Sequence, residues 1–355
     1  TNVVASHIAT QQPYGGVVQE LAYREHFRAI IHVVRQALAE AGQTYESVDA
    51  IAVTQGPGLA GALLVGISFA KALAFALEKP LIAVNHLEGH IHAVLLEQRR
   101  KGNHELQFPV LALVVSGGHT HLYLARLEDS GWTYENIGHT RDDAAGEAFD
   151  KVAKLLGLGY PGGPIIDRLA PHGDPHAVKF QTSQIKHRDR RERGQPESAD
   201  DRPRFDFSYS GIKTAVLRYV ETHDLRPAIA ARRRALSAME KPNIEDYLRL
   251  SDRQTLDLVA SFQRSMVEDL ATKTLAAARE HEVQTLFVSG GVAANRELRA
   301  TFEREAEMQG LPVFFPSRSL STDNAAMIAA AAFPKFLAKE FVAVDFSAEA
   351  GMALR

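Results

Sequence analysis

Two histidines stand one helical turn apart in the segment Asn85-His86-Leu87-Glu88-Gly89-His90. The segment follows an apolar strand and opens a predicted helix over residues 86–98, so His86 and His90 share one helix face and can hold a single metal ion. The same pattern also fits two surface imidazoles. Asn85 stands at the N-cap position, and Glu88 three residues later completes a capping box, which is the role we favour for Glu88.

A third ligand could come from Asp323, at the start of the last predicted helix. Two histidines and one carboxylate form a ligand set that suits iron(II) or zinc. The carboxylate could equally cap that helix or complement its dipole.

Zinc proteases use a similar pair of histidines, in the order His-Glu-x-x-His, with the glutamate beside the first histidine as general base. Here the order is His-Leu-Glu-Gly-His. This order rotates the carboxylate by about 100° round the helix. A metalloprotease is therefore disfavoured on geometry.

Glycine turns form the second group of candidate residues, because glycine lets backbone N–H groups approach phosphate oxygens closely. One such turn is usually only a turn, but three in one half of the chain favour nucleotide binding. Asp150, Asp167 and Asn295 lie near these turns, and carboxylates and amides can hold ribose hydroxyls or a base edge. The turns are Ser116-Gly117-Gly118, Pro161-Gly162-Gly163 and Ser289-Gly290-Gly291.

The segment from Gly56 to Gly61 also matches the dinucleotide-binding fingerprint, after a strand and before a helix. No acidic residue ends a following strand, however, and Glu78 lies at the end of the helix instead. A dehydrogenase is therefore disfavoured.

Hydrophobic periodicity predicts alternating strands and helices, which is typical of an α/β layer fold. The polar residues 99–108 indicate a domain boundary, and the charged residues 183–204 an exposed loop. Predicted strands cover 2–9, 50–54, 80–84, 286–288 and 312–316, with a hairpin over 110–125; predicted helices cover 19–41, 62–77, 86–98, 143–156, 255–281 and 324–333.

Length and composition favour two globular domains, with 355 residues, 45% hydrophobic and 23% charged. The absence of cysteine excludes disulfides, cysteine-ligated zinc and a cysteine nucleophile, and it fits the cytoplasm. We find no apolar run of about 18 residues and therefore expect no transmembrane helix.

The formal net charge of −3 lacks the basic excess of a protein that binds nucleic acid alone. Any RNA contact must then use a local patch or a partner's surface. Two basic runs are candidates, although both could be merely solvated loops: Arg188, Arg190, Arg191 and Arg193, and later Arg232, Arg233 and Arg234.

Seven motifs, in order along nearly the whole chain, together resemble the bacterial tRNA threonylcarbamoyladenosine synthase family, TsaD, which was formerly labelled a glycoprotease family. They are Asn-His-Leu-Glu-Gly-His (85–90), Val-Ser-Gly-Gly-His-Thr (115–120), Asp-Asp-Ala-Ala-Gly-Glu-Ala-Phe-Asp-Lys (142–151), Tyr-Pro-Gly-Gly-Pro (160–164), Phe-Ser-Tyr-Ser-Gly-Ile-Lys-Thr (207–214), Ser-Gly-Gly-Val-Ala-Ala-Asn-Arg (289–296) and Ser-Thr-Asp-Asn-Ala-Ala-Met-Ile-Ala (321–329).

The resemblance implies an actin-like ATPase (ASKHA) fold of two duplicated ribonuclease-H-like domains. The first would comprise residues 1–108 plus about 325–345, and the second residues 109–324 with the charged insertion 183–204. Family members open with a β-hairpin that carries a phosphate loop, and the strand at 2–9 resembles the strand after it. We therefore expect the first hairpin, roughly 25–30 residues, to be missing.

The resemblance also implies a cytoplasmic, metal-dependent acyltransferase. It would move threonylcarbamoyl from threonylcarbamoyl-AMP to N6 of adenosine 37 in tRNAs that read codons starting with A, releasing AMP. TsaB-like and TsaE-like proteins would be its partners, and no membrane is implied. The metal, iron(II) by preference or zinc, would be held by His86, His90 and Asp323; the adenylate by Val114, Val115, Ser116, Gly117, Gly118, Asp150, Gly163, Asp167 and Asn295.

No side chain stands out as a general base. Two other functions remain open. One is a non-catalytic, actin-like nucleotide-binding scaffold for partner proteins. The other is a sugar kinase, which would need the phosphate loop and an acidic base that the sequence does not offer.

Overall fold

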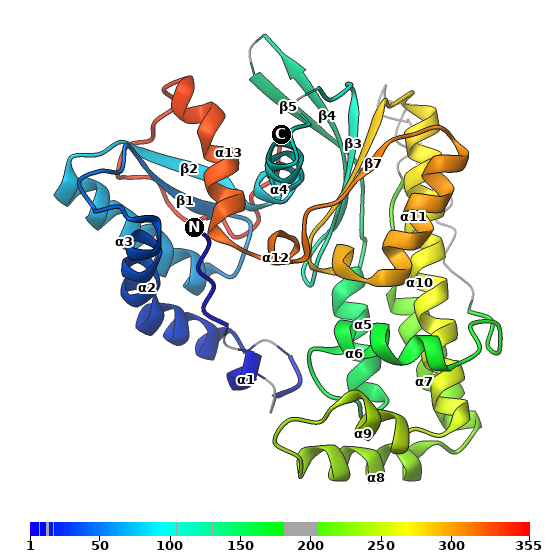
Figure 1. Cartoon of the computed structure of the whole chain (residues 1–355). Coiled ribbons are helices and arrows are strands. Elements are labelled where there is room, and N and C mark those ends of the chain that lie inside the picture. The colour runs from blue at the N-terminus through cyan, green and yellow to red at the C-terminus, as the bar shows by residue number, and fades with distance from the viewer. Residues whose placement is uncertain (7, 12–13, 17, 104, 130, 181–204) are drawn as a thin grey trace, which may run out of the picture.

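The computed structural model describes residues 1–6, 8–11, 14–16, 18–103, 105–129, 131–180 and 205–355, and within them the strands form two sheets (Figure 1). The smaller sheet pairs β1 (Ile51–Gly56) with β2 (Leu81–Asn85) in parallel. The larger sheet has five strands in the order β5-β4-β3-β6-β7. The α/β class predicted from the sequence is therefore confirmed.

The larger sheet joins an antiparallel meander to parallel strands. β3 (Val110–Val115) and β4 (Thr120–Glu128) form the predicted hairpin, and β5 (Gly131–His139), which was not predicted, pairs with β4. β6 (Thr285–Ser289) lies parallel to β3, and β7 (Val313–Phe314) lies parallel to β6. Because parallel strands end at the same edge, the glycine turns that follow β3 and β6 lie side by side.

Helices cover both faces of the larger sheet. Leu111, Leu113 and Val115 of β3 pack against helices on one face, while the alternate residues of β3 pack against α4 (His86–Arg100) on the other. Burial on both faces explains why β3 is continuously apolar. The helices of the first face are α5 (Ala145–Leu155), α6 (Gly162–Leu169), α7 (Ser210–Thr222), α10 (Arg253–Glu280) and α11 (Arg296–Met308).

The helix α4 occupies the centre of the molecule, between the two sheets (Figure 1). It continues directly from β2, and 11 of its 15 residues are buried. Leu87, Ile91 and Val94 pack on the larger sheet, whereas Ala93 packs with β2 and α13 (Ala325–Leu337). A short helix, α12 (Arg318–Ser321), precedes α13.

The smaller sheet is covered by α3 (Ala60–Leu77) and α13, and α2 (Gln19–Ala41) packs on α3. α3 is long and apolar enough to cross a membrane, with a mean hydropathy of 1.9, so the expectation that no such stretch exists was wrong. The expectation failed because Lys71 and small residues interrupt the apolar run, while the mean hydropathy over the 18 residues stays high. One helix of this kind is weak evidence, because core helices of soluble proteins pass the same test.

The predicted strand at residues 2–9 was also wrong. The described residues 1–6 pair with no strand, and Ile8–Gln11 form the short helix α1. Val3 and Val4 favour a strand locally, but a strand needs an edge to pair with, and this context overrides the propensity. The other predicted elements are present, with bounds shifted by a few residues, and the charged segment 183–204 lies outside the described residues.

The glycines at 56–61 serve internal packing. A Cβ atom at Gly56 would lie 1.9 Å from the carbonyl oxygen of Glu349, because the C-terminal segment crosses this turn. Gln55 and Gly58 exchange backbone hydrogen bonds with that segment, and Gly61 lies against Tyr23 of α2. These packing contacts account for the glycines that match the dinucleotide-binding fingerprint.

Two further helices, α8 (Arg226–Ser237) and α9 (Ile244–Arg249), form the lower end of the molecule in Figure 1. Arg232 of α8 was a candidate for an RNA contact or for a solvated loop, and the structure excludes both, since only 1% of the residue is exposed. Its guanidinium donates to the carbonyl oxygens of Leu156 and Leu250 and to Thr255 Oγ1. Arg232 therefore ties α8 to the segments on either side of it.

Replacing Arg232 by alanine should lower the free energy of unfolding by about 3 kcal/mol or more, because two carbonyl groups and a hydroxyl lose their donor and a cavity opens. Arg233→Ala, at the exposed neighbouring position, should change it by less than about 0.5 kcal/mol. Urea denaturation of both variants measures the difference. Equal effects would contradict the structural role of Arg232.

Candidate metal centre and nucleotide site

The three predicted metal ligands lie together although they come from distant parts of the chain. His90 Nε2 is 3.3 Å and His86 Nε2 is 3.6 Å from Asp323 Oδ1. One ligand atom from each residue lies within 4.8 Å of the others. His86 and His90 begin α4, where the Asn85 side chain accepts the Leu87 N–H and caps the helix as predicted, and Asp323 precedes α13.

The donor set fits a divalent metal ion. His90 is fully buried; its Nδ1 has no hydrogen-bond partner within the described residues, and its Nε2 approaches the Asp323 carboxylate at 3.3 Å. An unpaired buried polar atom is costly, and a metal ion would satisfy it. Two imidazoles and one carboxylate also leave positions open for a substrate, as iron(II) and zinc sites do.

The electrostatics of the cluster favour the forms that bind metal. Burial lowers the pKa of His86 to about 4, against the attraction of Asp323, so its imidazole is neutral at pH 7. Burial alone would raise the pKa of Asp323, but His90 and His86 hold it well below its usual range. Neutral imidazole and ionised carboxylate are the protonation states that metal binding requires.

The approach of Asp323 depends on a small residue in α4. Gly89 lies next to His90, and a Cβ atom there would lie 2.8 Å from Ile328 Cδ1 and 3.3 Å from Met327 Cγ of α13. The missing side chain lets α13 pass close to α4. This packing brings Asp323, at the beginning of α13, within reach of the histidine pair.

Glu88 has a further partner besides the predicted cap. Its carboxylate lies 3.4 Å from Lys335 Nζ of α13 and also interacts with the backbone N–H of Asn85. Burial raises the pKa of Glu88, although both partners oppose the shift. Glu88 thus faces away from the histidine pair and joins α4 to the far end of α13.

A cavity of about 430 Å³ lies on this other side of α4, lined by Asn85, Glu88, Tyr134 and Lys335 among others. Its lining contains none of the predicted metal or nucleotide ligands. This cavity therefore lies apart from the candidate chemistry.

Two of the candidate nucleotide-binding turns, those after β3 and β6, meet at one edge of the larger sheet. Gly290 has a positive φ of 94°, and a Cβ atom there would lie 2.3 Å from the Val115 carbonyl oxygen. The Gly146 N–H donates to the Ser116 carbonyl oxygen, which joins α5 to the first turn. Other glycines of these turns would place a Cβ atom in open space, namely Gly117, Gly118 and Gly291, and at Gly163 it would reach only ordinary contact with Phe149, at 4.0 Å.

The predicted polar residues of the nucleotide site hold these turns in place. Asp150 Oδ1 accepts the Gly162 N–H at 2.6 Å, and Asn295 Oδ1 accepts the Leu298 N–H at 2.9 Å. Asp167 accepts from the backbone and side chain of Arg296, both at 3.0 Å. Burial raises the pKa of Asp150 although the N–H groups of Gly162 and Gly163 oppose it.

The sequence interpretation missed a group of histidines beside the metal ligands. The ring of His119, in the turn between β3 and β4, lies 5.8 Å from that of His86 between centroids. His121 and His139 continue from it along the sheet. The motif Ser-Gly-Gly-His-Thr contains His119, so a histidine next to a candidate phosphate-binding turn was the available signal.

Comparison with known proteins identifies the family. The family model described as TsaD, tRNA N6-adenosine threonylcarbamoyltransferase, matches residues 1–330. The chain belongs to this family, which confirms the resemblance found in its motifs.

Two relatives agree with this assignment, and one solved structure shares the fold. A protein from Koribacter versatilis (strain Ellin345) named tRNA N6-adenosine threonylcarbamoyltransferase is 70% identical over 355 residues, which cover 100% of this chain and 93% of that protein. One of the same name from Syntrophobacter fumaroxidans (strain DSM 10017 / MPOB) is 50% identical over 94% of this chain and 86% of that protein. Full-length HypF in its phosphate- and nucleotide-bound form shares the fold, with a TM-score of 0.52 and 14% identity, over 86% of this chain and 50% of HypF.

Alanine at His86, His90 or Asp323 should lower the affinity for iron(II) or zinc by at least about 100-fold, because removing a direct ligand costs more than the 10–100-fold typical of outer partners. His92→Gln is a matched control on the same helix, since His92 Nε2 bonds the Tyr134 hydroxyl instead. Isothermal titration with each metal measures the affinities. Unchanged binding by the three alanine variants would exclude this site.

Proposed function

We propose that this chain transfers the threonylcarbamoyl group from threonylcarbamoyl-AMP to N6 of adenosine 37 in tRNAs that read codons starting with A. Its membership of the family supports this activity. The observation that carries the proposal is the contact between the candidate metal centre and the candidate phosphate turn, where the ring of His119 lies 5.8 Å from that of His86. An acyl adenylate would need both of these features, the metal centre at its carbonyl end and the glycine turn at its phosphate.

In the proposed reaction, the adenine N6 attacks the carbamoyl carbonyl carbon. The new N–C bond replaces the bond between that carbon and the phosphate oxygen, AMP leaves, and N6 loses a proton. Backbone N–H groups of Ser116 to Gly118 would stabilise the charge on the departing phosphate, since Gly117 and Gly118 face open space. No residue is assigned as the general base.

His86, His90 and Asp323 would hold one divalent metal ion, iron(II) by preference or zinc. When bound, such an ion supplies Lewis acidity for a carbonyl or phosphoryl oxygen. The three residues fix its place at the start of α4, next to the first glycine turn. The closeness of the neutral imidazole of His86 to that turn supports this arrangement.

The adenylate would lie along the edge where β3 and β6 end. Val114 to Gly118 would contact its phosphate, and Asp150, Gly163, Asp167 and Asn295 its nucleoside. The support is that the turns after β3 and β6 meet at this edge, that Asp150 of α5 accepts the Gly162 N–H, and that Gly163 and Asp167 lie one turn apart on α6.

We further propose an actin-like ATPase fold of two duplicated domains, divided as expected from the sequence. In support, β1 and β2 of the smaller sheet run parallel, as β6 and β7 do in the larger one. Within the described residues, the smaller sheet has no counterpart of β3, β4 and β5. The sequence-based expectation about the first β-hairpin stays a prediction.

The activity is tested by incubating the chain with labelled threonylcarbamoyl-AMP and an unmodified tRNA that carries adenosine 37. We expect label in the tRNA, equimolar AMP release, and a rate at least about 100-fold lower for His90→Ala because the metal ligands are incomplete. A version extended by the family's N-terminal hairpin, with the partner proteins added, runs in parallel. If neither version of the chain releases AMP or labels the tRNA although metal is bound, the transferase is refuted and the scaffold is favoured.

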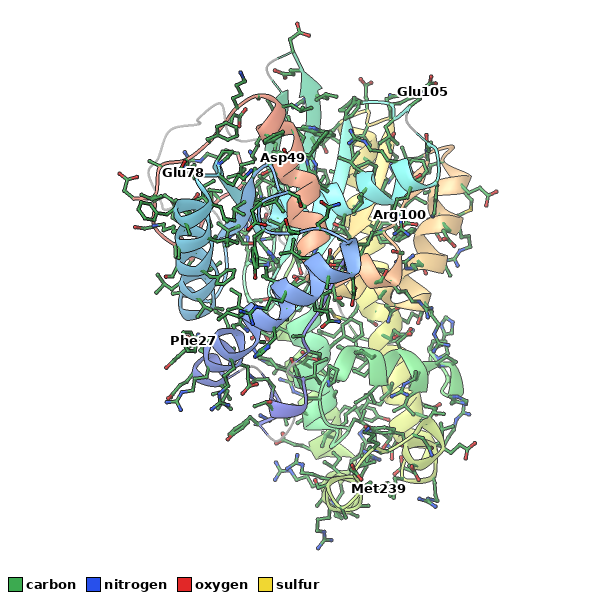
Figure 2. The ribbon with its side chains drawn as sticks, turned by 60° about the vertical axis from the view of Figure 1, so that its left-hand side comes forward. Phe27, Asp49, Glu78, Arg100, Glu105 and Met239 are labelled. Carbon is green, nitrogen blue, oxygen red and sulfur yellow. The ribbon has the colours of Figure 1, made fainter. Side chains whose placement is uncertain are left out.

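A partner-binding surface is proposed on α2, for a protein of the TsaB-like class, with a TsaE-like protein as a further partner in the cytoplasm. Phe27 and Ile31 lie one turn apart on the outer side of this helix, where Phe27 is 73% exposed and points outward (Figure 2), and Tyr23, one turn earlier, extends the apolar stripe towards α3. Apolar stripes of this kind mark interaction sites.

Phe27→Glu should weaken the binding of a TsaB-like partner by at least about 10-fold, because a charge enters the centre of an apolar contact. The melting temperature should stay the same, since the side chain is exposed. Leu127→Glu, at another exposed apolar position, serves as the control. Co-elution and titration calorimetry measure how tightly each variant binds the partner. Equal binding by Phe27→Glu and wild type would exclude this surface.

A further inference from the structure

Three histidines form a continuous row that starts at the candidate metal centre. The ring centroids of His119 and His86 are 5.8 Å apart, those of His119 and His121 are 5.7 Å apart, and those of His121 and His139 are 6.0 Å apart. Tyr123 stacks on His121 with nearly parallel rings, inclined by 6°. The row therefore leads from the metal ligands across β4 to the edge strand β5.

The row lies on the face of the larger sheet that α4 covers in part. Leu122 and Leu124 of β4 pack into the helical core on the opposite face, whereas Tyr123 and Ala125 pack with α4. Side chains alternate along a strand, so His121 points to the same face as Tyr123. His121 is paired with His139 across the two strands. The row is thus an aromatic strip beside α4 rather than part of either core.

Hydrogen bonds fix the orientation of these rings. The buried carboxylate of Asp206 accepts the His139 backbone N–H at 3.1 Å, lies 3.6 Å from His139 Nδ1, and accepts from Arg141 Nε at 3.0 Å. Asn136 Nδ2 lies 3.0 Å from His121 Nδ1. A Cβ atom at Gly138 would lie 2.2 Å from the Phe205 carbonyl oxygen, so the segment that carries Asp206 is held against β5.

Folding does not explain three half-buried imidazoles in a row. Apolar side chains on this strip would bury more surface without polar atoms to satisfy. Burial lowers the pKa of His121 to about 4, so this ring is uncharged at pH 7. An uncharged, flat ring is suited to contact with the face of another ring rather than with a phosphate group.

We propose that His119, His121 and His139 form a stacking surface for unpaired RNA bases that flank the acceptor adenosine. This inference rests on the proposed function, because an acceptor base in an anticodon loop must leave its stack to reach the metal centre, and its neighbours are then unstacked too. Single-stranded loops are recognised by stacking their bases on aromatic side chains, histidine included, and sheet faces commonly carry such residues. The row of histidines begins beside the candidate metal ligands and leads away from them, as the nucleotides of an RNA loop would.

The test uses the full chain with zinc and an unmodified anticodon stem-loop RNA in which the base after the acceptor adenosine is 2-aminopurine, whose fluorescence falls on stacking. We expect wild type to quench the probe, His121→Ala to bind the RNA about 10-fold more weakly with little quenching, and His121→Phe to bind within about 2-fold of wild type. His223→Ala is the control, since His223 stacks on Tyr219 of α7 outside the row. Zinc content and melting temperature are measured for each variant.

Rescue by phenylalanine separates stacking from hydrogen bonding or proton transfer, which Phe cannot replace. The inference is overturned if wild type does not quench the probe, if His121→Phe fails like His121→Ala, or if His121→Ala raises the KM for threonylcarbamoyl-AMP instead of that for RNA. Because the probe is read without the adenylate, the two proposals fail separately. Quenching without transfer would refute the transferase, and transfer without quenching would refute the stacking surface.

Discussion

The packing of one helix between two sheets is the constraint on which the rest of the structure depends. α4 continues directly from the smaller sheet, and its apolar residues are buried against the larger one. Its first turn carries His86 and His90, so burial of the helix also places the candidate ligands. Rotating α4 to remove them would expose Leu87, Ile91 and Val94, and the hydrophobic effect opposes that exposure at roughly 1.5–3 kcal/mol per side chain.

The candidate binding residues have a second role in keeping the site ordered before any ligand arrives. Asp150 holds the turn at Gly162, Asn295 caps α11, and Asp167 holds Arg296. The polar groups of the site are thus fixed by the backbone around them, which reduces the ordering cost of binding. The same contacts explain why caps and ligands cannot be told apart by residue type alone.

Sequence reasoning succeeded where the signal is local and failed where it depends on distant packing. The spacing of His86 and His90, the cap at Asn85 and the hairpin of β3 and β4 follow from neighbouring residues. The close pass of α13 over Gly89 and the burial of Arg232 depend on segments far along the chain, so no local pattern encodes them. Val3 and Val4 led to the wrong prediction of a strand at residues 2–9, because strand propensity does not reveal whether another strand is available for pairing.

The position of Asp323 has a topological consequence. It meets His90 across more than two hundred residues of intervening chain, so an ion shared by them would close a very large loop, much as a disulfide does. Closing a loop of that size removes more freedom from the unfolded chain than closing a short one, and the free energy of ion binding adds to that of folding. The supply of metal in the cell would thereby add to the stability of the contact between the start of α4 and the start of α13.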